Sequence, residues 1–306
     1  MALPQQAKSA RLTNSSIGDT IDDGLGNAEK AFADILGITA DTDVNRVLNR
    51  PWGSRGQASK NNTGTPNTKF DLIADAWIFG NSGKASYTRF SPSTVTVDVT
   101  VAGPAANGRD QAGVFSASSW LHFYIIDDIT GVNPLAGIVS LTAPPTGPTL
   151  PSGYTHWSYA GAVRFNASSQ LRLTRIRANF AFYDEDENDQ LALSAGVATS
   201  FTSVDLSAFI PPNALASYLE LISSGNHATP GTSLTARLRT TGTAAANGNN
   251  LFVANVTQVA GQTVEARGFG FIPNVSQTVD YRIANAPAGG GAYIAVFGYL
   301  LPNGGC

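Results

Sequence analysis

Apolar and polar residues alternate along this chain from Phe70 onward, with the two-residue period of a β-strand. In residues 94–100, for example, Val95, Val97 and Val99 share one face and polar residues occupy the other. We expect strands at 70–79, 94–102, 120–126, 137–141, 154–165, 171–183, 198–206, 216–222, 234–241, 251–257, 263–271, 277–284 and 292–301. Half-buried strands separated by Gly, Pro and Asn turns, with no crossover helices, predict an all-β fold. The expected architecture is an antiparallel β-sandwich, jelly-roll-like, preceded by one short N-terminal α-helix.

That helix is the exception to the alternating pattern. Asp22 or Asp23 can cap its N-terminus, and Gly37 stands at its end. Its apolar residues recur at helical spacing and are Leu25, Ala28, Phe32, Ile35 and Leu36. A lone helix with an apolar stripe must bury it, either on its own β domain or on a neighbouring subunit or particle. We expect these five residues to dock the protein to a larger particle.

Composition divides the chain into regions. Residues 49–69 are rich in Gly, Asn, Thr and Ser, which is typical of a linker. We therefore expect an anchoring arm with a helix at 1–48, a linker at 49–69 and a β-sandwich domain at 70–306. A break near 185–197 would divide the last region into two packed β subdomains.

Two further segments indicate architecture. Residues 143–153 contain four prolines and should form a stiff crossing that leads into the long strand 154–165. The final strand is apolar on both faces, which is typical of a central strand or of one at a subunit interface. We expect Tyr293, Phe297 and Tyr299 to contribute to a homo-oligomer interface.

Charge and cysteine content exclude several classes of protein. Only 13% of the residues are charged, and the net charge is −3, so the sequence shows no electrostatic footprint for nucleic acid or an anionic membrane. Cys306 is the single cysteine, which rules out an internal disulfide and a cysteine metal cluster. The N-terminus lacks the apolar core of a signal peptide, and no apolar run is long enough for a membrane span. We expect synthesis and assembly in a cytoplasm.

No catalytic motif stands out. The three histidines, His122, His156 and His227, are not accompanied by a nucleophile elbow or a zinc-protease or nucleotide-binding motif. Gly268 and Gly270, on either side of Phe269, indicate a bulge or tight packing. We expect no enzyme activity, no catalytic residue and no cofactor.

The acidic run 184–189 is the one concentrated charge. Asp184, Asp186 and Asn188 have the alternating spacing of oxygen ligands at the start of a calcium loop. However, Asp189 occupies the position of the usual glycine, and Ala195 the position of the usual glutamate. The two interpretations are a weak metal site and a solvated hairpin turn. Glycan cleavage would need a partner carboxylate on another strand, such as Asp127 or Asp128.

Aromatic side chains offer a binding chemistry instead. Flat rings with polar tips can stack on sugars or anchor a protein interface, and they can equally fill a β core. The candidates are Trp157, Tyr159, Tyr183, Tyr218 and Tyr281.

Three groups of segments have an architectural pattern in common with a known family. The first group is 22–29 with 33–38, the second is 120–126 with 136–140 and 150–155, and the third is 204–212 with 292–299. Together they resemble tailed-bacteriophage virion structural proteins of the tail-fibre or appendage type. Heptad stalks and β-helix or collagen-like repeats are absent, so the resemblance favours a short appendage over a long fibre.

The resemblance implies a location in the virion and a homo-oligomer, often a trimer. It implies that the N-terminal arm binds other virion proteins and that the β domain contributes to host attachment, through a host surface glycan or protein. One alternative is a capsid decoration or head-fibre protein that stabilises the shell. Another is a glycan depolymerase.

Overall fold

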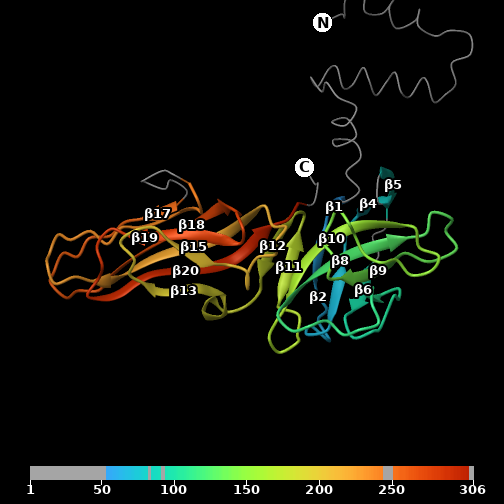
Figure 1. The fold of residues 1–306 in the computed structure, drawn as a ribbon, viewed down its shortest axis with the longest axis horizontal. Helices are drawn as coiled ribbons and strands as arrows, with labels where there is room; N and C mark the ends of the chain where they lie inside the picture. Colours follow the sequence, from blue (N-terminus) through green and yellow to red (C-terminus); the bar gives the residue numbers. More distant parts are fainter. Residues whose placement is uncertain (1–52, 82–83, 91–93, 244–250, 303–306) are drawn as a thin grey trace, which may run out of the picture. The chain divides into compact units, whose positions relative to one another are not determined.

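The computed structural model describes residues 53–81, 84–90, 94–243 and 251–302 (Figure 1). The predicted arm and its helix lie outside these ranges, as does Cys306. The docking residues named above, Leu25, Ala28, Phe32, Ile35 and Leu36, are therefore outside the described structure.

Within these ranges the fold is all-β, as predicted, and a short 3₁₀ turn, η1 (Glu187–Gln190), interrupts the strands. The strands of the first half are β1 (Gly53–Arg55), β2 (Ala58–Asn61), β3 (Lys69–Leu72), β4 (Ala76–Asn81), β5 (Lys84–Phe90), β6 (Val95–Asp98), β7 (Gly108–Arg109), β8 (Ser119–Asp127), β9 (Ala136–Ser140), β10 (His156–Phe165), β11 (Thr174–Arg177) and β12 (Phe180–Tyr183). Those of the second half are β13 (Leu191–Gly196), β14 (Thr202–Asp205), β15 (Ala216–Asn226), β16 (Ala236–Thr240), β17 (Leu251–Val253), β18 (Val264–Pro273), β19 (Thr278–Ile283) and β20 (Gly289–Leu300).

The described strands form three sheets. A seven-stranded sheet has the order β1-β4-β10-β8-β9-β7, with β5 on β4. A nine-stranded sheet has the order β18-β15-β20-β12-β11-β2-β3-β6, with β13 on β20, and a four-stranded sheet has the order β14-β19-β16-β17. The pairings among these strands are antiparallel except for β7 with β9, which is parallel. The prediction of antiparallel sheets is thus confirmed.

Buried apolar side chains join the seven-stranded sheet to the β11-β2-β3-β6 part of the nine-stranded sheet. The ring centroid of Phe70 on β3 lies 4.8 Å from that of Phe123 on β8. Gly137 on β9 is so close to β6 that a Cβ there would lie 2.3 Å from Val97. One face of β11, β2, β3 and β6 is therefore covered by the seven-stranded sheet.

The other part of the nine-stranded sheet contacts the four-stranded sheet in the same way. A Cβ at Gly268 on β18 would lie 2.7 Å from Val253 on β17, and the Ser223 hydroxyl on β15 hydrogen-bonds to the Leu234 carbonyl. Strand β20 connects the two parts, since it pairs with β15 along one edge and with β12 and β13 along the other (Figure 1).

Two sequence predictions are wrong in detail. Residues 53–61 of the predicted linker form β1 and β2, and β2 is an interior strand between β11 and β3. The polar composition concealed this strand because its inward-facing side chains make hydrogen bonds. The Asn61 amide donates to the Pro66 carbonyl (2.7 Å), and its oxygen accepts from the Thr174 amide (2.8 Å).

The second correction concerns residues 171–183, which were predicted to form one strand. They form the hairpin β11–β12, in which Arg177 pairs with Phe180. Ala178, in the turn, has a φ of 51°. The alternation changes phase across the turn, since Ile176 and Ala181 are buried while Arg175 and Phe182 are exposed. The turn contains neither glycine nor proline, so the sequence offered no strong signal for it.

Candidate functional site

One row of residues crosses the nine-stranded sheet from β18 to β6, with each member directly opposite the next. The row is Phe271, Tyr218, Gly298, Phe182, Arg175, Lys60, Asp71 and Thr96. Directly opposite residues share a face, so this row defines one face of the sheet. It is the face opposite to the one covered by the other two sheets, and it is called the open face below.

Aromatic side chains gather on the β12, β20, β15 and β18 part of the open face. The members of this aromatic cluster are Phe180, Phe182, Tyr218, Phe269, Phe271 and Phe297. The centroids of Tyr218 and Phe271 are 4.9 Å apart, and those of Phe180 and Phe271 are 5.3 Å apart.

Two members of the aromatic cluster are half exposed, with Phe269 at 53% and Phe271 at 52% of their full accessible area. Contiguous exposed apolar area on a protein surface marks a site of interaction. The strand that carries both residues, β18, stands at the end of the sheet and pairs, among the described strands, with β15.

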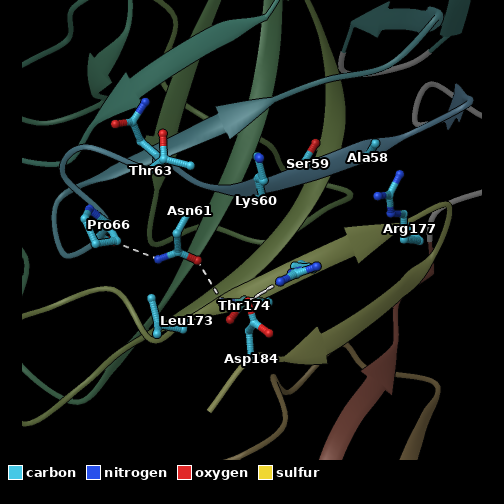
Figure 2. Close-up of a pocket in the computed structure, with 12 residues that line it drawn as sticks. Ala58, Ser59, Lys60, Asn61, Thr63, Pro66, Leu173, Thr174, Arg177 and Asp184 are labelled. Carbon is cyan, nitrogen blue, oxygen red and sulfur yellow. Dashed lines mark hydrogen bonds and ion pairs between the residues drawn. The ribbon is translucent and has the colours of Figure 1, made fainter.

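Basic side chains occupy the neighbouring part of the open face, on β2 and β11. Lys60 lies directly opposite Arg175, and Arg177 follows two residues along the same face of β11. Together with the β2–β3 loop these residues line a groove of about 290 Å³, called the basic groove below (Figure 2). Like charges directly opposite each other destabilise a sheet, so the placement of Lys60 opposite Arg175 lowers the stability of this sheet.

One carboxylate offsets part of this charge. Asp184 accepts hydrogen bonds from Nε (3.0 Å) and Nη2 (2.6 Å) of Arg175, and both side chains are about half exposed. Asp71, on the far side of Lys60, is buried and accepts from Thr96 and Asn62. Among the described residues, no carboxylate lies within ion-pair distance of Lys60 or Arg177.

The structure separates the predicted calcium ligands. Asp184 is bound to Arg175, whereas Asp186 is exposed and precedes η1. Between them Glu185 turns inward and pairs with Arg172 at 2.5 Å. Among the described residues, no three His, Cys, Asp or Glu side chains gather as a metal site would require. The side chain of Asn188 lies outside the described structure.

The three residues predicted to form an oligomer interface also lie in different environments. Phe297 belongs to the aromatic cluster, and Tyr293, four residues earlier on β20, is half-buried. Tyr299 is wholly buried inside one chain, where its hydroxyl donates to the Ala162 carbonyl at 2.7 Å. The prediction that Tyr299 lies at an interface is therefore wrong, because the bulge between Tyr218 and Leu219 in the pairing of β15 with β20 shifts the alternation of β20.

Among the aromatic binding candidates, only Tyr218 reaches the surface. Trp157, Tyr159, Tyr183 and Tyr281 are buried. They belong to the core of the molecule.

The histidines have structural partners. Burial lowers the pKa of His122 to about 4, and its Nδ1 lies 3.0 Å from the Tyr159 hydroxyl. Nδ1 of the buried His156 lies 2.8 Å from the Thr155 hydroxyl, and Nδ1 of His227 accepts from the Thr229 amide. A buried neutral imidazole such as His122 cannot reach a substrate in solution.

The sequence held a signal for the aromatic cluster. In Gly268-Phe269-Gly270-Phe271 the glycines face inward against Leu251 and Val253, and both phenylalanines face outward. The tight-packing interpretation of the glycines is correct, because residues 264–273 pair with β15 in one unbroken register. The basic groove had no such signal, since it requires β2 and β11 to be neighbours.

Comparisons with known proteins identify no family. No protein-family model and no curated protein matches this sequence. Among solved structures, the chain is similar to a tryptic core variant of Cry1Da from Bacillus thuringiensis, with 8% identity and a TM-score of 0.17. The match covers 82% of this chain and 52% of that one, so the chain spans about half the length of that structure. A likeness this weak carries no argument. No helix among the described residues is long and apolar enough to span a membrane.

Proposed function

We propose that this protein is a structural attachment protein of a virus particle, a short appendage that self-associates through its aromatic cluster. The observation that carries the proposal is the open face, where exposed phenylalanines stand beside an edge strand. The resemblance to tailed-phage appendages supplies the particle, the trimeric state and the role in host attachment. It also supplies the expectation that residues 1–48 bind other virion proteins.

The occupant of the aromatic cluster is a second copy of this chain. The end strand β18 presents backbone donors and acceptors along its outer edge, and another extended strand can satisfy them. Every assembly of this protein contains identical chains, so a second copy is always available as the partner. The rings that association buries would supply the apolar part of the interface. Phe297 and Tyr293 remain proposed residues of the oligomer interface, and Tyr299 does not.

A sandwich arrangement of the sheets supports this role. We propose two β-sandwiches that share the nine-stranded sheet, one closed by the seven-stranded sheet and the other by the four-stranded sheet. The Phe70–Phe123 contact supports the first, and the Gly268–Val253 contact supports the second. The jelly-roll connectivity stays a prediction.

Replacing Phe269 and Phe271 together by serine tests the self-association. Both rings are half exposed, so the double variant should fold, while its contact area is lost. We expect the wild-type chain to be an oligomer by light scattering at micromolar concentration and the variant to be a monomer. Phe252→Ser is the matched control, since Phe252 is 63% exposed on β17 of another sheet and should leave the oligomer intact. A monomeric wild type, or an oligomeric double variant, would contradict the proposal.

Particles that lack the protein test the role in attachment. We expect such particles to adsorb poorly to host cells and adsorption to return when the wild-type protein is supplied. Normal adsorption with fragile particles would identify a capsid decoration instead, and antibody labelling would then place the protein on the head. Release of reducing ends from host surface glycan would identify a depolymerase.

A further inference from the structure

We propose that the basic groove binds the acidic groups of a host surface polysaccharide. The inference rests on the proposed role in attachment and names the chemical class of the receptor. Lys60, Arg175 and Arg177 converge on the groove from two adjacent strands, and Asp184 is the single carboxylate among the residues that line it.

The charges of the groove favour an anion. Opposite residues on paired strands lie about 5 Å apart and diagonal ones about 7–8 Å apart, so the three cations form one close group. Asp184 engages Arg175, while Lys60 and Arg177 have no ion pair with a described residue. A bound anion would relieve the repulsion between Lys60 and Arg175 that the sheet register imposes.

Arginine suits this task. Its guanidinium binds carboxylate, sulfate or phosphate oxygens through two parallel hydrogen bonds. Arg177 is exposed and lies beside Ala58, at the end of the groove that is farther from the β2–β3 loop (Figure 2). Thr63 of that loop lines the groove and adds a hydroxyl for the hydroxyls of a sugar.

The dimensions and surroundings favour a polysaccharide over a nucleic acid. A volume of about 290 Å³ lies at the small end of ligand pockets, which suits a short stretch of a polymer. Leu173, which is 37% exposed and lines the groove, provides an apolar surface for a sugar ring. Among the residues that line the groove none is aromatic, so the groove offers no ring on which a nucleic-acid base could stack.

The test is affinity electrophoresis of the full chain in gels that contain one polymer each. The probes are polygalacturonate for carboxylate, dextran sulfate for sulfate, polyphosphate for phosphate, and neutral dextran as the control. We expect retardation by at least one acidic polymer, none by dextran, and loss of binding in 1 M salt, where the screening length falls to about 3 Å.

Two variants with opposite effects locate the binding in the groove. Lys60→Gln with Arg177→Gln should weaken binding about fivefold to tenfold, since two exposed cation contacts are lost. Asp184→Asn should strengthen it, because Arg175 then becomes free for the ligand. The control double variant, Arg55→Gln with Arg237→Gln, also removes two positive charges, but from β1 and β16, and should leave affinity unchanged.

The outcomes separate this inference from the proposed function. No binding to any acidic polymer, or equal loss in the control double variant, would overturn the groove as a site. Tighter binding to oligothymidylate, lost in the Lys60/Arg177 variant, would replace the polysaccharide by a nucleic acid. If the groove binds acidic polymers but particles without the protein adsorb normally, the role in attachment fails and the site stands. If the groove binds none of them but adsorption needs the protein, attachment stands and the groove inference fails.

Discussion

At the scale of residues, buried polar groups carry much of the specificity of this fold. Tyr299 is the clearest case, because it lies in the core between Trp120 and Tyr183, with ring centroids 5.5 Å and 5.9 Å away. Burial raises the pKa of its hydroxyl well above the usual value, so the group stays a hydrogen-bond donor at any ordinary pH. Its bond to the Ala162 carbonyl ties β20 to β10 of the seven-stranded sheet.

Replacing Tyr299 by phenylalanine should therefore destabilise the chain. The Ala162 carbonyl would be left without this donor in a buried place, which costs about 1–3 kcal/mol of unfolding free energy. Tyr154→Phe is the matched control, since it removes a bond to the Pro134 carbonyl where water can replace the donor. Denaturant unfolding measures both, and equal effects of the two variants would contradict the interpretation of Tyr299.

His122 gives the fold a dependence on pH. Because burial lowers its pKa from 6.5 to about 4, the unfolded chain binds this proton between those values and the folded chain does not. Protonation thus favours the unfolded state, and the free energy of unfolding should fall as the pH drops from 6.5 to 4. The slope from this one group is up to about 1.4 kcal/mol per pH unit.

Urea unfolding of wild type and His122→Gln across this range measures the effect. The variant should lose most of the slope whatever its stability at neutral pH, and His227→Gln should keep it. An unchanged slope in His122→Gln would show that another group titrates. Asp128 acts at lower pH, since hydrogen bonds from Thr130 and Asn133 lower its pKa to about 2, and its contribution is lost as the pH falls from 3.8 towards 2.

At the scale of elements, β2 shows how a polar strand can be central. Its neighbours β11 and β3 pair with it on both sides, and the buried Gln57 just before it donates to the Ala160 carbonyl at 2.5 Å. Hydrogen bonds of this kind hold a strand in place where apolar side chains are scarce. Residues 53–61 therefore belong to the β domain, and the expected linker can extend only to residue 52.

Two truncations should differ sharply for this reason. Deleting residues 1–50 should leave the melting temperature of the β domain unchanged. Deleting residues 1–60 removes β1 and most of β2, so several kcal/mol should be lost and the melting temperature should fall by about 10 °C or more. Thermal denaturation followed by circular dichroism compares them, and equal melting temperatures would contradict the central role of β2.

At the scale of the whole molecule, one continuous sheet carries both the aromatic cluster and the basic groove. Its open face is aromatic over β12, β20, β15 and β18 and basic over β11 and β2, and the two regions meet where Arg175 lies opposite Phe182. If the aromatic cluster holds copies together, each oligomer presents several basic grooves. Linked weak sites bind a repeating polymer far more tightly than a single one does, which suits a protein that attaches to a surface.

The all-β class and many of the strands can be predicted from the sequence, because a two-residue alternation of side chains is a local property of the chain. The sequence also indicated Phe297 as a candidate interface residue and Tyr218 as a candidate binding residue. The sequence did not predict the hairpin at Ala178 or the strand β2, since the turn contains neither glycine nor proline and β2 is held by hydrogen bonds of polar side chains.

Which residues share the open face depends on contacts between segments that are distant in the sequence. Arg175, Lys60 and Phe271 are far apart in sequence, and the sheet register alone brings them into one row. The same register turned Tyr299 inward and left Phe271 outside. Strand order and register depend on contacts between distant segments, so the pattern within each segment cannot specify them.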